Sequence, residues 1–200
     1  MANGHKGEVP MNDDARLVLK LISELLDYPG RLGFWDRVSE HADLAGELDA
    51  RLKVVYDEFR QHKTIELEKV YVATFDFNPK ASLYITGHEL GDSRDRGQAL
   101  IELTALYRRA GYEVSDDQLA DFLPQLLEFI AVRPDLGNAL LLKRIARAAQ
   151  RIRDHLGTDN LYRPLFDLIL RTLEYPVKPV DSGRDEHPDL DNLPYPVEYR

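Results

Sequence analysis

Apolar residues in this 200-residue chain recur at spacings of three and four, in segments that proline or glycine repeatedly ends. That spacing places them on one face of an α-helix, whereas a strand would need alternation with a period of two. No segment keeps strand alternation long enough for a sheet, and no fixed-period repeat is present. The sequence therefore predicts an all-α fold, a single-domain compact helical bundle, with stacked helix hairpins as the structural alternative.

Local signals predict where the helices begin and end. The apolar stripes span residues 17–26, 34–42, 48–59, 67–75, 100–107, 119–130 and 140–156, with a short helix within 80–90 and a last one from about 160 to 173. Asn12 or Asp13 is expected to cap the first helix, Thr64 the fourth, and Ser115 with Gln118 the helix that carries residues 119–130. Pro124 leaves two interpretations open, because it either kinks that helix or starts a fresh one in its first turn.

The chain is predicted to divide into a flexible N-terminus (1–12), a helical domain (13–173) and a C-terminal tail (174–200). Prolines and acidic residues fill the tail, so it cannot continue the helical pattern and is expected to be extended or disordered. The first residues lack the apolar core of a signal peptide, and no apolar run approaches the roughly 20 residues that span a bilayer. We therefore expect a cytoplasmic protein without direct membrane insertion.

Composition and motifs exclude several classes of function. The net charge of −9 argues against nucleic-acid binding, and the absence of Cys excludes disulfides and thiolate metal sites. The six histidines are isolated, and His88-Glu89 lacks the second His of a zinc-protease motif because residue 92 is Asp. No phosphate-binding loop or nucleophile elbow is present. We predict no enzymatic activity, no metal and no cofactor.

Two groups of residues are candidates for binding a partner. Tyr71, Phe75, Asp76 and Phe77 precede the helix-breaking Asn78-Pro79, and Asp121, Pro124 and Glu128 share one face if they lie on one helix. Together they would form an apolar groove with an acidic rim, suited to a basic amphipathic segment. The alternatives are a core aromatic stripe for the first group and a solvated face for the second.

Four segments together form the most specific pattern in the chain. The longest is Tyr71-Val-Ala-Thr-Phe-Asp-Phe-Asn-Pro-Lys-Ala-Ser-Leu-Tyr84. The others are Gly91-Asp-Ser-Arg-Asp-Arg-Gly97, Leu106-Tyr-Arg-Arg-Ala-Gly111 and Asp121-Phe-Leu-Pro-Gln-Leu-Leu-Glu-Phe129. In order and spacing, these segments resemble the nitrate reductase molybdenum cofactor assembly chaperones, also called the delta subunit family. With the leading helix at 15–29, the resemblance covers most of residues 15–173.

This resemblance implies a chaperone without enzymatic activity, which binds the catalytic (alpha) subunit of nitrate reductase and keeps it open for insertion of the molybdenum cofactor. Cofactor-delivery proteins are further candidate partners. Our hypothesis for the residues above is that Tyr71, Phe75 and Phe77 anchor an N-terminal client segment while Asp76, Asp121 and Glu128 attract its positive charge. Five more residues are implied by the family motifs alone, either touching the client or shaping a loop: Lys80, Ser82, Tyr84, Arg94 and Arg96.

Two other functions stay open at this point. Related chaperones bind twin-arginine leader peptides and carry a Glu-Pro-x-Asp-His stretch near the position of Asp121. This chain has Phe122 in place of that His and no Glu-Pro before Asp121, which favours the nitrate reductase branch. An enzyme or a nucleotide-binding regulator is the alternative from a different class, and it is disfavoured because the phosphate loop, metal cluster and nucleophile motif are missing.

Overall fold

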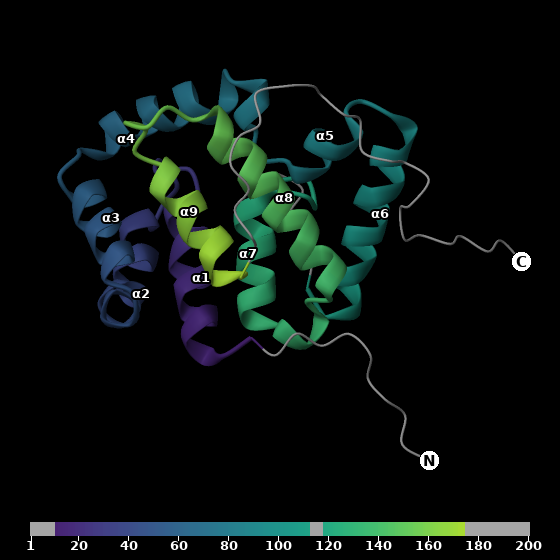
Figure 1. Cartoon of the computed structure of the whole chain (residues 1–200), viewed down its shortest axis with the longest axis horizontal. Helices are drawn as coiled ribbons and strands as arrows, with labels where there is room; N and C mark the ends of the chain where they lie inside the picture. Colours follow the sequence, from purple (N-terminus) through teal and green to yellow (C-terminus); the bar gives the residue numbers. More distant parts are fainter. Residues whose placement is uncertain (1–10, 113–117, 175–200) are drawn as a thin grey trace, which may run out of the picture.

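The computed structural model describes residues 11–112 and 118–174, and this part of the chain is all-α (Figure 1). The helices are α1 (Asp13–Leu25), α2 (Phe34–Leu48), α3 (Ala50–Arg60), α4 (Thr64–Tyr71), α5 (Ile85–Leu90), α6 (Arg94–Arg109), α7 (Leu123–Val132), α8 (Ala139–His155) and α9 (Arg163–Thr172). Shorter turns are the π-helical turn η1 (Val72–Asp76) and the 3₁₀ turns η2 (Pro79–Ala81) and η3 (Pro134–Leu136). The predicted helical class is confirmed.

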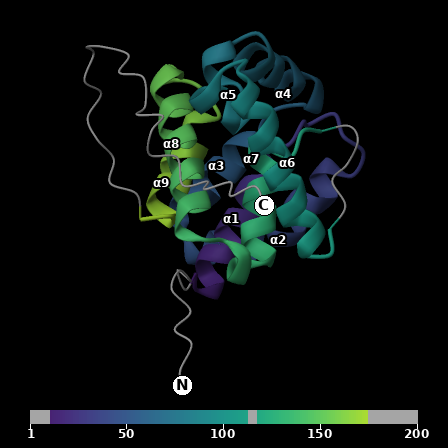
Figure 2. The same cartoon turned by 90° about the vertical axis from the view of Figure 1, so that its right-hand side faces the viewer.

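The core forms around α1, which packs mainly against α7 and α2. Leu21, Ile22 and Leu25 of α1 are completely buried, as are Leu126 and Leu127 of α7. Figure 1 shows α1 and α7 near the centre, with α2 to α4 on one side and α5 and α6 on the other, and Figure 2 also shows α1 and α7 near the centre. The amphipathic helix α8 packs on α9 and α5, so the two ends of the bundle share one apolar core.

Capping explains most helix boundaries. The Asn12 side chain accepts a hydrogen bond from Ala15 N at 2.7 Å, as the sequence predicted for α1. Gly111 follows α6 with a positive φ of 82°, the conformation that makes glycine favourable after a helix end. Pro124 lies in the first turn of α7, so it starts a fresh helix rather than kinking a longer one.

Four predicted details at the helix ends are wrong. Thr64 does not cap α4, because Lys63 precedes the helix and donates its backbone N–H to Glu66 at 3.0 Å. Leu48 was expected at the start of the third helix, on its apolar face. It instead ends α2 and is 44% exposed, while Asp49 caps α3. The helix expected to begin at Ser115 and Gln118 begins later, because residues 118–122 are not helical. Ser115 itself lies outside the described residues. The Asn160 side chain accepts a hydrogen bond from Tyr162 N in a turn before the last helix, and α9 begins only at Arg163.

The predicted domain limits stay an expectation. Residues 1–10 of the proposed N-terminal segment and residues 175–200 of the proposed tail lie outside the described part of the chain. Among the described helices, none combines the length and apolar composition that crossing a bilayer requires.

Candidate functional site

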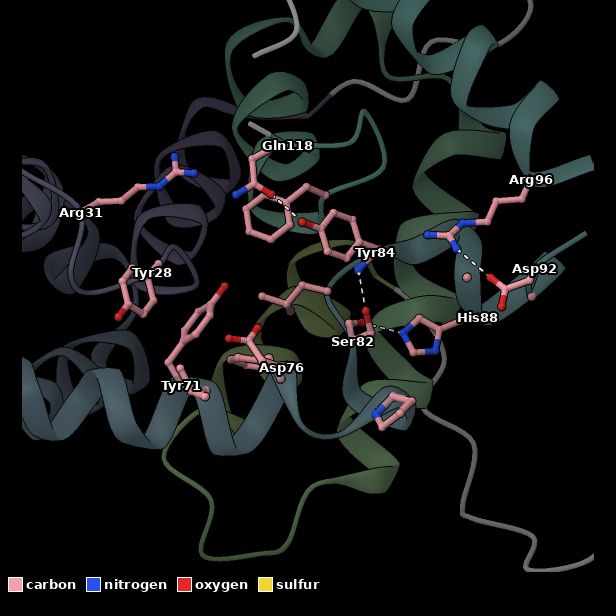
Figure 3. A pocket seen from close by; sticks show the side chains of 17 residues that line it. Tyr28, Arg31, Tyr71, Asp76, Ser82, Tyr84, His88, Asp92, Arg96 and Gln118 are labelled. Carbon is pink, nitrogen blue, oxygen red and sulfur yellow. Dashed lines mark hydrogen bonds and ion pairs between the residues drawn. The ribbon is translucent and has the colours of Figure 1, made fainter. Parts of the chain in front are cut away.

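A pocket of about 810 Å³ opens between the α1–α2 connection, the end of α4 and the segment that carries η2 and α5 (Figure 3). We call it the aromatic pocket, because five of its lining side chains are aromatic. Its lining comprises Tyr28, Arg31, Tyr71, Val72, Phe75, Asp76, Pro79, Ser82, Leu83, Tyr84, Gly87, His88, Gly91, Asp92, Arg96, Gln118 and Phe122.

One wall of the pocket is a cluster of aromatic rings. Tyr71 packs edge-on against Tyr28 and Phe75, with ring centroids 5.4 and 5.0 Å apart. Tyr71 and Phe75 are only 6% and 3% exposed, so they belong to the core and also form the base of the pocket. Burial raises the pKa of Tyr71, which keeps its phenol protonated and able to donate a hydrogen bond. The wall therefore offers apolar ring faces with a few polar edges.

The π-helical turn η1 places Asp76 at the pocket and Phe77 outside it. Its closing hydrogen bond runs from Phe77 N to Val72 O at 3.1 Å, so one more residue is accommodated than in a regular α-turn. Asp76 lines the pocket, and no hydrogen bond or ion pair joins its carboxylate to the described residues. Partial burial raises the pKa of Asp76. Asp76 is thus an acceptor ready for a cationic or N–H-bearing ligand.

The opposite wall is polar and held by hydrogen bonds (Figure 3). The Tyr84 hydroxyl donates to Gln118 Oε1 at 2.7 Å, and Arg96 Nη1 lies 3.3 Å from Asp92 Oδ1. His88 Nε2 lies 2.6 Å from the Ser82 carbonyl, and burial lowers the pKa of His88. A neutral ring must donate through Nε2 to make this contact. Ser82, Tyr84 and Arg96, implied by the family motif, therefore reach the pocket.

Asp121 is wholly buried and does not line the pocket, which corrects its expected place on an acidic rim. Its carboxylate accepts hydrogen bonds from Thr86 N at 3.0 Å and from Thr86 Oγ1 at 2.5 Å. Thr86 lies in the first turn of α5, so the Asp121 side chain satisfies one of the free N–H groups at the start of that helix. Its role is to hold α5, which carries His88, in place.

Pro124 and Glu128 do not line the aromatic pocket but a second, adjoining pocket of about 200 Å³ beside α1, which shares Arg31, Gln118 and Phe122 with it. Pro124 is buried, and the Glu128 carboxylate forms an ion pair with Lys20 at 2.6 Å. Asp121, Pro124 and Glu128 do not share a helix face, because α7 begins only at Leu123. The predicted single groove with an acidic rim is therefore wrong in this half.

Three more predicted residues lie outside the aromatic pocket. Phe77 is 81% exposed, and Lys80 and Arg94 are exposed on the surface. Phe77 follows Asp76 directly, so it is available to a ligand at the mouth of the pocket but does not form its wall. The structure brings together Tyr71, Phe75, Asp76, Ser82, Tyr84 and Arg96 from the predicted set.

Sequence reasoning missed several lining residues, among them Tyr28, Arg31, His88 and Gln118. Arg31 and Arg96 balance Asp76 and Asp92, so the lining has mixed charge rather than the predicted acidic character. In the sequence, Pro29 and Gly30 indicate only the end of the first helix, and nothing there marks Tyr28 as a lining residue. In the described part of the chain, no three His, Asp or Glu side chains are grouped as metal ligands.

Comparison with known proteins connects this geometry to one family. The profile described as "Nitrate reductase delta subunit" matches residues 39–158. The nitrate reductase molybdenum cofactor assembly chaperone NarJ of Escherichia coli (strain K12) is 28% identical over 184 residues, covering 85% of this chain and 78% of that protein. The probable chaperone of the same name from Bacillus subtilis (strain 168) is 26% identical, covering 80% of this chain and 90% of its own.

A third relative is much longer. The nitrate reductase-like protein NarX of Mycobacterium tuberculosis (strain ATCC 25618 / H37Rv) is 33% identical over 142 residues, which cover 69% of this chain but only 22% of that protein. The match to the delta subunit profile, residues 39–158, includes the pocket residues from Tyr71 to Phe122, whereas Tyr28 and Arg31 precede it.

Proposed function

Since this chain belongs to the nitrate reductase delta subunit family, we propose that it is a system-specific chaperone for the assembly of a nitrate reductase. It binds the immature catalytic subunit in the cytoplasm and holds it open while the molybdenum cofactor is inserted. The proposal assigns it a binding role and no catalytic step. Its support is the family membership together with a pocket that has the features of a peptide-binding site.

The main support for the proposal is the Asp76 carboxylate at the edge of an aromatic wall, which no hydrogen bond or ion pair joins to another residue of the described chain. An amphipathic peptide would place an apolar side chain against Tyr71 and Phe75 and a basic group beside Asp76. Arg31, which also lines the pocket, would meet a carboxylate or carbonyl of the same segment. We propose the N-terminal segment of the catalytic subunit as this peptide.

Moderate affinity suits this task, because the chaperone must release its client. A single short segment in such a pocket typically binds with a Kd of about 1 μM, which corresponds to roughly −8 kcal/mol. A rigid wall held by the Tyr84–Gln118 and His88–Ser82 hydrogen bonds limits the ordering cost on the chaperone side.

The function is tested by deleting the gene in its own host and purifying the nitrate reductase catalytic subunit. We expect this subunit to accumulate without molybdenum cofactor, and a plasmid copy of the chaperone to restore the cofactor content. Pull-down of the cofactor-free subunit by the tagged chaperone tests direct binding. A fully loaded catalytic subunit in the deletion strain would overturn the proposal, whereas cofactor loss in an exported molybdoenzyme alone would favour a twin-arginine leader chaperone.

A further inference from the structure

One face of α8 carries Lys143, Arg147, Arg151 and His155 at successive spacings of four. This spacing places side chains on one face of a helix, and all four are exposed. We call this set the α8 basic row. Its positive charge contrasts with the net charge of −9 of the whole chain.

The fold neutralises the neighbouring cations of α8 but leaves the row without carboxylates. Arg144 pairs with Glu89 at 2.8 Å, and Arg153 pairs with Asp154 and Asp167. Among the described residues, no carboxylate forms an ion pair with Lys143, Arg147 or Arg151. Arg151 donates instead to the carbonyl oxygen of His88, at the rim of the aromatic pocket. Like charges at this spacing repel one another, so an acidic segment bound along the row would stabilise it.

The sequence of the same chain contains such a segment. Residues 181–191 carry acidic side chains at Asp181, Asp185, Glu186, Asp189 and Asp191, with Arg184 as the one basic residue of fixed charge. Charge complementarity of this kind favours binding and sets its orientation. The row and the segment are therefore matched in sign and in approximate number of charges.

The described chain ends near the start of the α8 basic row, so residues 181–191 are within reach of the row. Glu174 and Leu142 line the same pocket, and Leu142 immediately precedes Lys143 at the start of the row. From residue 174 to residue 181 an extended chain spans roughly 25 Å, at about 3.5 Å per residue. The row from Lys143 to His155 is about 18 Å long at the helical rise of 1.5 Å per residue. We propose that residues 181–191 bind the α8 basic row of their own chain.

Carbodiimide cross-linking of the full-length protein tests this proposal, because Lys143 is the amine of the row. Mass spectrometry should find Lys143 linked to a carboxylate within 181–191 in the monomer, at a yield independent of protein concentration. The link should decrease as NaCl is raised to about 1 M, since salt screens exposed charges. Absence of the link, or its appearance only in dimers, would overturn the proposal.

A matched pair of variants separates the row from general electrostatics. Arg147→Glu/Arg151→Glu leaves the Lys143 amine in place and should lower the cross-link yield roughly fivefold or more, because it reverses two charges of the row. Arg108→Glu/Arg109→Glu makes the same charge change at exposed positions of α6 and should leave the yield near that of the wild type. An equal loss in both variants would also contradict specific binding to α8. The salt dependence of the wild type decides the question independently of how the variants fold.

Discussion

Asp121 shows how a single buried carboxylate holds one wall of the aromatic pocket. Both of its hydrogen bonds to Thr86 lie in the first turn of α5, and its backbone carbonyl also accepts from Ile85 N at 3.1 Å. Because the side chain is completely buried, a client cannot reach it without local unfolding. Asp121 therefore acts through α5 rather than by touching the client.

Asp121→Ala is expected to lower the free energy of unfolding by about 2–3 kcal/mol, because it leaves the Thr86 N–H and hydroxyl buried without an acceptor. Urea denaturation followed by circular dichroism measures this loss. The matched control is Glu128→Gln, which removes a half-exposed ion pair with Lys20 and should cost less than about 1 kcal/mol. A fully stable Asp121→Ala protein that no longer binds client peptide would instead show a direct contact.

Residue patterns predicted part of the site and failed where the local backbone was misjudged. Tyr71, Phe75 and Asp76 were found from an aromatic stripe with a carboxylate, and they do lie at one pocket. The same patterns place Asp121 on one face with Glu128, because they predict one continuous helix. Periodicity cannot show that α7 begins at Leu123, because the apolar pattern continues through the non-helical residues before it.

At the scale of elements, α5 is tied to α8 by an ion pair with little exposure. Arg144 and Glu89 lie 2.8 Å apart, with side chains 7% and 14% exposed. Such a pair holds two elements in a defined register, since removing one partner costs the other a charge-assisted contact in a place with little water. Because α5 carries His88 and Gly87 of the pocket, this contact also sets the shape of the polar wall.

Glu89→Ala is therefore expected to destabilise the fold by about 3 kcal/mol, the lower end of the range for breaking a buried ion pair. The double variant Glu89→Leu/Arg144→Met, which replaces both charges with apolar groups, should recover most of that loss. Thermal and urea unfolding of the two variants give the comparison. Equal destabilisation by both variants would mean that side-chain shape, rather than loss of the Glu89–Arg144 ion pair, dominates.

The elements differ in how far the sequence could predict them. The helices α1 and α8 were predicted correctly, because each has a long apolar face and a capping residue that indicate the same helix. The π-helical turn η1 was not predictable, since Val72 to Asp76 continue the apolar pattern of α4 and no residue type marks the extra residue. Yet this turn decides that Asp76 enters the pocket and Phe77 does not.

At the scale of the whole molecule, the fold contains a histidine that responds to acid. Burial lowers the pKa of His88 from its usual value of 6.5, so the unfolded chain takes up this proton at a higher pH than the folded one. His88 therefore contributes stability that is present above about pH 6.5 and is lost as the pH falls below it.

We expect the wild type to lose more unfolding free energy than His88→Gln when the pH is lowered from about 7.5 to about 5.5, because only the wild type must protonate a buried ring. Gln keeps an N–H donor for the Ser82 carbonyl, which makes it the matched replacement. Urea titrations at both pH values supply the four free energies. Parallel losses in the two proteins would show that His88 is not the responsive group.

The all-helical class followed from the sequence, because every long apolar segment has helical spacing. The arrangement of the helices did not follow, since pairing depends on contacts between distant segments such as α1 with α7. The pocket joins residues from 28 to 122, and several of its members, Arg31 among them, have no local signal. Its mixed charge could be seen only after the fold had brought these segments together.

Calorimetric titration with a peptide copying the N-terminus of the cognate nitrate reductase catalytic subunit tests the central claim most directly. Micromolar binding to the wild type, weakened roughly tenfold by Asp76→Asn and unchanged by Glu128→Gln, is the result expected, because a charge-assisted contact contributes about 1.5–3 kcal/mol. Comparable binding by wild type and Asp76→Asn, or no binding by the wild type, would contradict recognition of this segment by the aromatic pocket.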